Sequence, residues 1–291
     1  MPLSVQLGLV LALATAVASL VGFLLKYRGA VESPDVEWRK PIRSSLRLFR
    51  SRAYVYGMAV AMGSWGLHVG ALALAPISLV QTVIAAGLVL LTVLANSVFA
   101  HDVTQREWLG VAMTAAGLAF LAATVGNTGD SAHSGFDAAT LATYVGLITL
   151  AGTAAAIAGW QAATGSSLVA TSAGLLWGAS DVSIKALSGT LDERGIGVMV
   201  HPLAFVILLL SAYGLIVSTR SLQRGRAVPV IAITAAAANV STIAAGPIVF
   251  GEPMPEGALA VTVRLLAFTL VVAAAALTPP PRTPEEAVAK A

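Results

Sequence analysis

Ionisable side chains inside long apolar stretches are the residues of this sequence with the clearest capacity for chemistry. Asp181 and Lys185 lie in the apolar stretch 168–189, and Arg264 lies in the stretch 257–277. Because they are four residues apart, Asp181 and Lys185 share one helical face and can pair. With Arg264 they would form a cluster of net charge +1, which could receive a carboxylate or another anionic group. The alternatives are mutual neutralisation of Asp181 and Lys185, and extension of the cationic side chains to the membrane surface.

Uncharged polar and aromatic side chains complete the predicted substrate-binding set. His68 lies inside an apolar stretch, where a packed, hydrogen-bonding role is the simpler interpretation. Gln81, Asn96 and Asn239 lie on two apolar stretches and are expected to line a cavity between them. Trp177 can stack on a cation or fill the interior. We predict no catalytic residue and no metal-binding residue.

Catalytic and nucleotide-binding signatures are missing from the sequence. Cysteine is absent, which excludes disulfides, thiolate metal sites and cysteine nucleophiles. There is no zincin His-Glu-x-x-His, no nucleophile elbow and no phosphate-binding Gly-rich loop. We therefore predict a protein that is not an enzyme and holds no cofactor. Tight binding of Mg²⁺ is disfavoured, because Asp181 is the core carboxylate that the sequence offers and Lys185 is placed to neutralise it.

The composition places these residues in a membrane. Of 291 residues 57% are hydrophobic and 11% are charged, whereas soluble domains carry about 25% charged residues. A helical span needs roughly 20 apolar residues, and the stretches are continuously apolar rather than alternating as in a β-barrel. We predict an all-α, polytopic membrane protein with about nine spans, at 3–25, 54–74, 77–99, 106–125, 139–160, 168–189, 200–219, 228–250 and 257–277.

Basic residues predict the orientation of these spans. The segment 26–52 holds eight of the seventeen Lys and Arg residues. If it is cytoplasmic, fourteen cations lie inside and only Arg194 lies outside, which is the usual bias of membrane proteins. We therefore predict a multi-pass protein of the plasma membrane with its N-terminus outside and its C-terminus inside. The segment either attracts anionic lipid or serves only as a topology signal.

The two halves of the chain echo each other. A shift of 150 residues lays span 77–99 on 227–249 and Asp102 on Glu252, and a shift of 159 lays Leu9–Lys26 on Leu168–Lys185. Equivalent spans are five apart, so they must point in opposite directions, as in the inverted repeats of secondary transporters. The expected divisions are a first repeat (1–137, with a basic loop at 26–53), a linking helix (138–164), a second repeat (165–277) and a disordered Pro-rich tail (278–291).

Short motifs in both halves resemble a known superfamily. They are the stretch from Gly70 to Gln81, the turn Phe99–Asp102, Arg106-Glu-Trp-Leu-Gly110, Gly117-Leu-Ala-Phe120, Gly174-Leu-Leu-Trp-Gly-Ala-Ser180, Val228-Pro-Val230 and Phe250-Gly-Glu252. This pattern resembles the drug/metabolite transporter (EamA-like) superfamily over roughly residues 5–277. Each half lacks the second helix of the superfamily, and a basic loop follows Lys26. In these two features the chain is most similar to the NIPA-like magnesium transporter branch and its bacterial relatives.

These observations predict a secondary transporter of a small solute, working by alternating access around a midplane cavity between the repeats. The resemblance implies a magnesium or divalent cation carrier as the alternative. A third hypothesis is a structural or lipid-interacting membrane protein without transport. The expected partners are the solute, a coupling proton or cation, and membrane lipids at segment 26–52. A homo-oligomer is left open, and no nucleic acid is expected.

Overall fold

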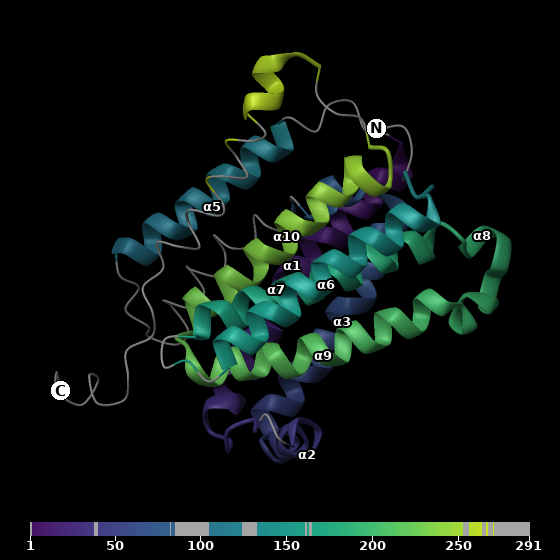
Figure 1. The fold of residues 1–291 in the computed structure, drawn as a ribbon. Helices are drawn as coiled ribbons and strands as arrows, with labels where there is room; N and C mark the ends of the chain where they lie inside the picture. The colour runs from purple at the N-terminus through teal and green to yellow at the C-terminus, as the bar shows by residue number, and fades with distance from the viewer. Residues whose placement is uncertain are drawn as a thin grey trace.

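The structure is a computed structural model that describes residues 2–37, 40–81, 83–84, 105–123, 133–160, 162, 165–252, 256–263, 266 and 270. Every regular element in these ranges is a helix, which confirms the all-helical class. The helices are α1 (Leu3–Val31), α2 (Pro41–Leu46), η1 (Arg47–Arg50), α3 (Arg52–Leu74), α5 (Gln105–Ala123), α6 (Ala138–Trp160), α7 (Ser166–Ser188), α8 (Leu191–Arg194), η2 (Gly195–Val200), α9 (Pro202–Arg224) and α10 (Ala227–Val249) (Figure 1).

Five of these helices are long and apolar enough to cross a membrane. They are α1, α3, α6, α9 and the part of α10 from Pro229 to Val249. Helix α7 has the same length as α3, 23 residues, but carries Asp181, Lys185 and several serines. The expected spans 77–99 and 257–277 fall largely outside the described residues, so the nine-span inverted repeat stays a prediction.

Helices α3, α6 and α9 begin at residues whose side chains cap the first turn. Ser51 accepts the backbone N–H of Tyr54 at the start of α3, at 3.4 Å. Asp137 accepts the backbone N–H of Thr140 at 2.8 Å at the start of α6. Pro202 opens α9 directly after His201, whose ring accepts the N–H of Leu203. Such residues satisfy backbone donors that have no partner in the first helical turn.

Glycines show how the helices pack and in which direction they run. A Cβ on Gly8 would meet Ala75, and one on Gly29 would meet Tyr54, so α1 and α3 are antiparallel. A Cβ on Gly174 would meet Thr234, and one on Gly178 would meet Ser241, so α7 and α10 are parallel and their backbones are very close. Small residues allow such close contact between membrane helices.

The sequence contains two Gly-x-x-x-Gly motifs, Gly66–Gly70 and Gly174–Gly178, and they differ in role. Gly174 and Gly178 both face α10, so this pair is a helix-packing motif. Gly66 has open space where its Cβ would be, and Gly70 faces the side chain of Leu11 at 3.2 Å. Only the second motif is a helix-packing motif along its whole length.

Helices that the predicted repeat relates to each other form corresponding pairs. The most extensive helix contacts join α1 to α3 and α7 to α9, and α6 and α10 both pack on α7. Contacts from His68 to Asp181 and from Leu72 to Lys185 show that α3 and α7 run in the same direction. Helix α1 therefore runs opposite to α7, as the inverted repeat requires of these two helices.

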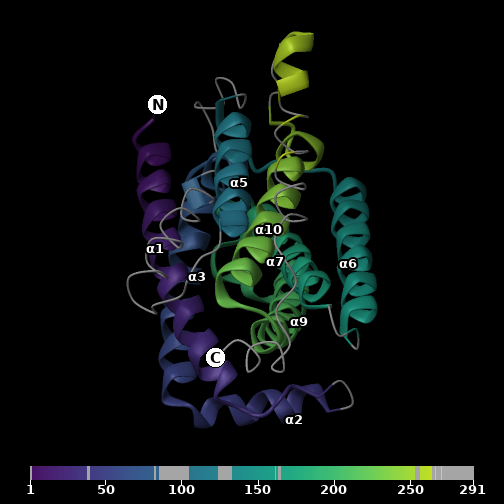
Figure 2. The ribbon, with the colours of Figure 1, turned by 90° about the vertical axis from the view of Figure 1, so that its left-hand side faces the viewer.

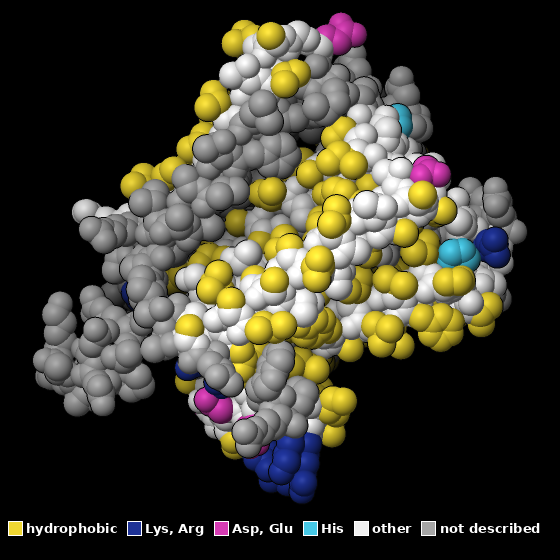
Figure 3. Space-filling model, viewed as in Figure 1, with side chains coloured by type: hydrophobic (Ala, Val, Ile, Leu, Met, Phe, Trp, Pro, Cys, Tyr) yellow, Lys and Arg dark blue, Asp and Glu magenta, His cyan; other side chains and the backbone are white. Residues whose placement is uncertain are grey.

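The basic segment forms one end of the bundle and is more ordered than a loop. Helix α1 continues to Val31, beyond the expected end at 25, and α2 with η1 crosses the end of the bundle (Figure 2). Figure 3 shows the largest group of Lys and Arg side chains at this end, with hydrophobic side chains over the flank. Lys26 does not belong to this basic surface, because it is buried in α1 with its ammonium 4.2 Å from the ring centre of Phe23.

Candidate functional site

Asp181 lies at the centre of a polar cluster formed by three helical segments. Its Oδ1 is 3.1 Å from Nε2 of His68 on α3, and the two side chains are 14% and 9% exposed. Its Oδ2 accepts a hydrogen bond of 3.2 Å from the amide of Gln81, which lies in the helical residues 77–81. The His68 contact is close but not aligned as a hydrogen bond, and neither ring nitrogen has a hydrogen-bond partner in the described part of the chain.

Lys185 lies one turn further along α7 and has different partners. Its side chain is fully buried, and its ammonium donates to the carbonyls of Leu72 and Ala75 at 2.8 and 2.9 Å. These carbonyls end α3, whose C-cap is Ala75. The last carbonyls of a helix have no intrahelical partner and carry partial negative charge, so a buried cation is stabilised there.

Glu252 is a second buried carboxylate, directly after α10. It is 4% exposed, and its Oε1 accepts the backbone N–H of Ile77 at 2.9 Å. Its Oε2 accepts the hydroxyl of Ser78. The carboxylate thus lies at the beginning of the helical residues 77–81, where free N–H groups favour an anion. Gly246 leaves room for it, since a Cβ there would meet the Glu252 carboxylate.

These contacts form what we call the Pro76 clamp: Lys185, Glu252 and the helix break at Ala75–Pro76. Lys185 binds the helix end before the break and Glu252 binds the helix start after it. Lys185 and Glu252 carry opposite charges, and both are buried beside this helix break. The clamp therefore ties α7 and the end of α10, both from the second half, to the junction between two helical segments of the first half.

Two further predicted residues lie inside the bundle. Trp177 is on α7, where its ring packs on Gly214 of α9, and its buried Nε1 has no hydrogen-bond partner among the residues described. Asn239 is buried on α10, on the helix that α7 packs against. For Trp177 these contacts match the space-filling interpretation. Asn96 and Arg264 lie outside the described residues.

The structure rearranges the charge cluster expected from the sequence. Asp181 is contacted by His68 and Gln81, whereas Lys185 donates to backbone carbonyls of α3. Spacing along α7 alone allowed an Asp181–Lys185 pair, but a neighbouring helix end satisfies the ammonium instead. The expectation that Asp181 is the one core carboxylate is wrong, because Glu252 is buried as well. The sequence signal for Glu252 was its place directly after a span, at a position equivalent to Asp102 in the repeat.

The cluster is not a preformed metal cage within the part of the chain that the structure describes. No group of three or more His, Asp or Glu side chains there could hold a metal ion. What it offers is one carboxylate between an imidazole and an amide. Such a site can hold a proton, form hydrogen bonds, or attract a cation that keeps its own water.

One curated protein is similar to nearly the whole chain. The "Probable magnesium transporter NIPA9" of Arabidopsis thaliana is 26% identical over 280 residues, which cover 90% of this chain and 78% of that protein. No family model and no solved structure matches the chain. Because it covers 90% of the chain, the similarity extends into both halves. It supports a multi-pass membrane transporter rather than an enzyme, and it confirms that the chain resembles the NIPA-like branch of transporters.

Proposed function

We propose that this protein is a secondary transporter that carries a small solute by alternating access between its two halves. The support comes from two closely packed helix pairs, α1 with α3 and α7 with α9. The first helix of one pair, α1, runs opposite to the first helix of the other, α7. The cluster at Asp181 lies where α3 of the first half meets α7 of the second. A site between two such units can face either side of a membrane as the units rock.

We further propose that the solute is a small hydrated cation, with Mg²⁺ as the first candidate. The observation that carries this proposal is the separation of Asp181 from Lys185: the ammonium is occupied by carbonyls of Leu72 and Ala75, so the carboxylate charge is available to a solute. Mg²⁺ keeps several waters and binds through one or two carboxylates. The name of the Arabidopsis relative favours this ion.

The contacts argue against the anionic solute considered from the sequence. That hypothesis needs Lys185 and Arg264 to outnumber Asp181 at the site. Lys185 is instead held at the end of α3, within the Pro76 clamp. No cation other than the ring of His68, when protonated, contacts Asp181 among the described residues.

The test is Mg²⁺ uptake into proteoliposomes that contain purified protein and a Mg²⁺-sensitive dye. Wild-type protein should take up Mg²⁺ faster than empty vesicles. Asp181→Asn should lower uptake at least about tenfold, since loss of even 1.4 kcal/mol of binding is a factor of ten. Asp137→Asn is the matched control, because it removes an exposed carboxylate and should leave uptake near wild type.

Two results would refute the proposal in different ways. Uptake no faster than in empty vesicles for Mg²⁺, other divalent cations and a panel of organic solutes would point to a protein without transport. Normal Mg²⁺ uptake by Asp181→Asn would preserve a transporter but remove Asp181 from its path. A thermal-shift screen against the same panel would identify a solute other than Mg²⁺.

A further inference from the structure

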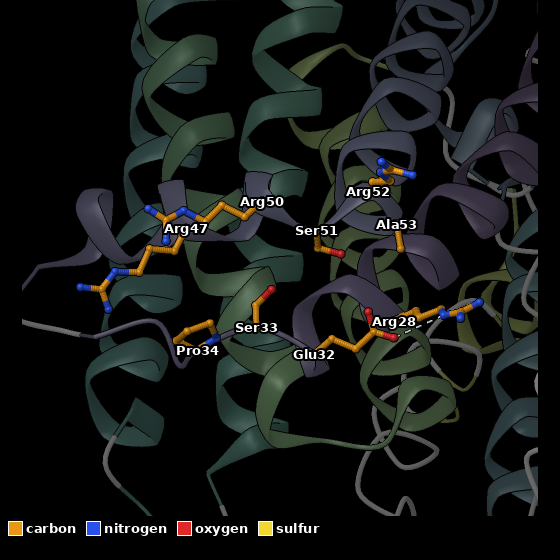
Figure 4. Close-up of a pocket in the computed structure, with 9 residues that line it drawn as sticks. All are labelled: Arg28, Glu32, Ser33, Pro34, Arg47, Arg50, Ser51, Arg52 and Ala53. Carbon is orange, nitrogen blue, oxygen red and sulfur yellow. Dashed lines mark hydrogen bonds and ion pairs between the residues drawn. The ribbon is translucent and has the colours of Figure 1, made fainter.

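A cavity lined by arginines lies at the basic end of the bundle, at the start of α3, whereas His68 of the polar cluster lies toward the other end of this helix. Its volume is about 490 Å³, and it lies between the end of α1, η1 and the start of α3 (Figure 4). Four arginines and one glutamate line it, a net charge of +3; the lining is Arg28, Glu32, Ser33, Pro34, Arg47, Arg50, Ser51, Arg52 and Ala53.

The arginines surround the cavity from two sides. Arg47 and Arg50 lie on one side of Ser33 and Ser51, and Arg28 and Arg52 lie on the other (Figure 4). Acids only partly balance them: Arg28 is 3.4 Å from Glu32, and Arg47 is 3.9 Å from Glu37.

Two guanidinium groups therefore remain for a ligand. No acidic side chain lies within ion-pair distance of Arg50 or Arg52 in the described residues. Arginine binds phosphate through two parallel hydrogen bonds, so a cavity lined by arginines favours a phosphate group over a simple halide.

An apolar surface lies directly beside this cavity, on α2 and η1. Ile42, Leu46 and Phe49 are 69%, 63% and 46% exposed, and their spacing places them on one helical face. Arg43, Arg47 and Arg50 form the next face, and the third face is buried by Ser44 and Leu48. A short helical segment with separate apolar and cationic faces, lying across the end of a bundle, is typical of an element at a membrane surface.

We propose that this cavity binds the phosphate headgroup of an anionic phospholipid, whose acyl chains lie along Ile42, Leu46 and Phe49. A topology signal alone needs basic residues in the segment, but it does not need basic residues from three helices to line one cavity. It also does not need an uncovered apolar face next to that cavity. A soluble phosphate would use the arginines and leave this apolar face without a function. The proposal does not depend on the transported solute.

Native mass spectrometry of the full-length protein in a neutral detergent tests the proposal, because the micelle supplies no charged surface. Wild-type protein should retain one phosphatidylglycerol in preference to phosphatidylcholine with the same chains. Arg47→Gln with Arg50→Gln should weaken this retention by about thirtyfold, from the electrostatic contribution of two cations near a lipid surface. Lys40→Gln with Arg43→Gln removes the same charge from the same segment outside the cavity lining, and should retain the lipid as wild type does.

Further variants and controls distinguish a specific lipid-binding site from a general effect of charge and from misfolding. Arg47→Lys with Arg50→Lys should keep part of the preference, and both glutamine variants should match wild type in thermal stability in phosphatidylcholine. Equal loss of phosphatidylglycerol in the two glutamine variants would overturn the proposal. Inorganic phosphate that displaces the lipid at equal concentration would assign the cavity to a soluble phosphate, which also overturns it.

Discussion

Replacing Lys185 by methionine tests whether the Pro76 clamp stabilises the fold. The substitution keeps most of the buried volume but removes the ammonium that donates to Leu72 and Ala75. It also leaves the buried Glu252 without its nearby positive charge. A buried group left without its hydrogen-bond partner costs about 1–3 kcal/mol, and two carbonyls are affected here, so we expect Lys185→Met to lower the free energy of unfolding by about 2–6 kcal/mol.

The assay is reversible denaturation of the purified protein in mixed micelles, followed by helix content. Lys26→Met is the matched control: Lys26 is also buried, but its ammonium lies over the ring of Phe23, so its loss should cost at most about 2 kcal/mol. Adding Glu252→Gln to Lys185→Met should recover at least about 1 kcal/mol, because no uncompensated charge remains.

A free energy of unfolding of Lys185→Met within about 1 kcal/mol of the wild-type value, which is the range of an exposed ion pair, would contradict this expectation. A loss in the double variant equal to the sum of the two single losses would contradict it as well. Either result would mean that the two charges are hydrated rather than buried together at this end of the bundle.

Three further predictions concern packing, capping and topology. Gly174→Val should lower the free energy of unfolding by about 1–3 kcal/mol through a clash with α10, whereas Gly66→Val, which faces open space, should change it by less than about 0.5 kcal/mol; micelle denaturation of both variants checks this. The hydrogen bond from the α6 backbone lowers the pKa of Asp137 below its usual 3.8, so its stabilisation should be complete above that pH and lost as the pH falls through the lowered pKa; thermal melts of wild type and Asp137→Asn should therefore differ near neutral pH and converge in acid. In intact cells a membrane-impermeant maleimide should label Gly135→Cys, and it should label Arg43→Cys only after permeabilisation; the reverse pattern would contradict the N-out orientation.

Helix positions were predictable from the sequence because a membrane span is defined by local composition. The stretches 54–74 and 139–160 match α3 and α6 within two residues at each end. Their boundaries depend on caps and prolines that are adjacent in the chain. The basic segment was less predictable, because its residues were expected to be a loop. Ser44 would be an accessible position for cysteine labelling if the segment were a loop. In the structure it is buried and donates to the carbonyl of Lys40.

The partners of the buried charges were not predictable from local spacing. Four residues separate Asp181 from Lys185, which permits a pair on one helix. The carbonyls that bind Lys185 are 113 and 110 residues away in the chain, and the N–H that Glu252 accepts is 175 residues away. Which contact forms depends on how the helix break at Pro76 meets α7 and α10, and that arrangement is a property of the packed bundle.

The Pro76 clamp also has a consequence for how often this end of the protein is open. If the proposed alternating access opens the protein at this end, the open form separates Lys185 and Glu252 from the two helix ends that they bind. At a cost of about 3 kcal/mol, roughly one molecule in a hundred would be open at equilibrium. A solute that binds only the open form would then show an apparent affinity about a hundredfold weaker than its intrinsic affinity. A weak apparent affinity of the whole protein is therefore compatible with a site that binds its solute well once exposed.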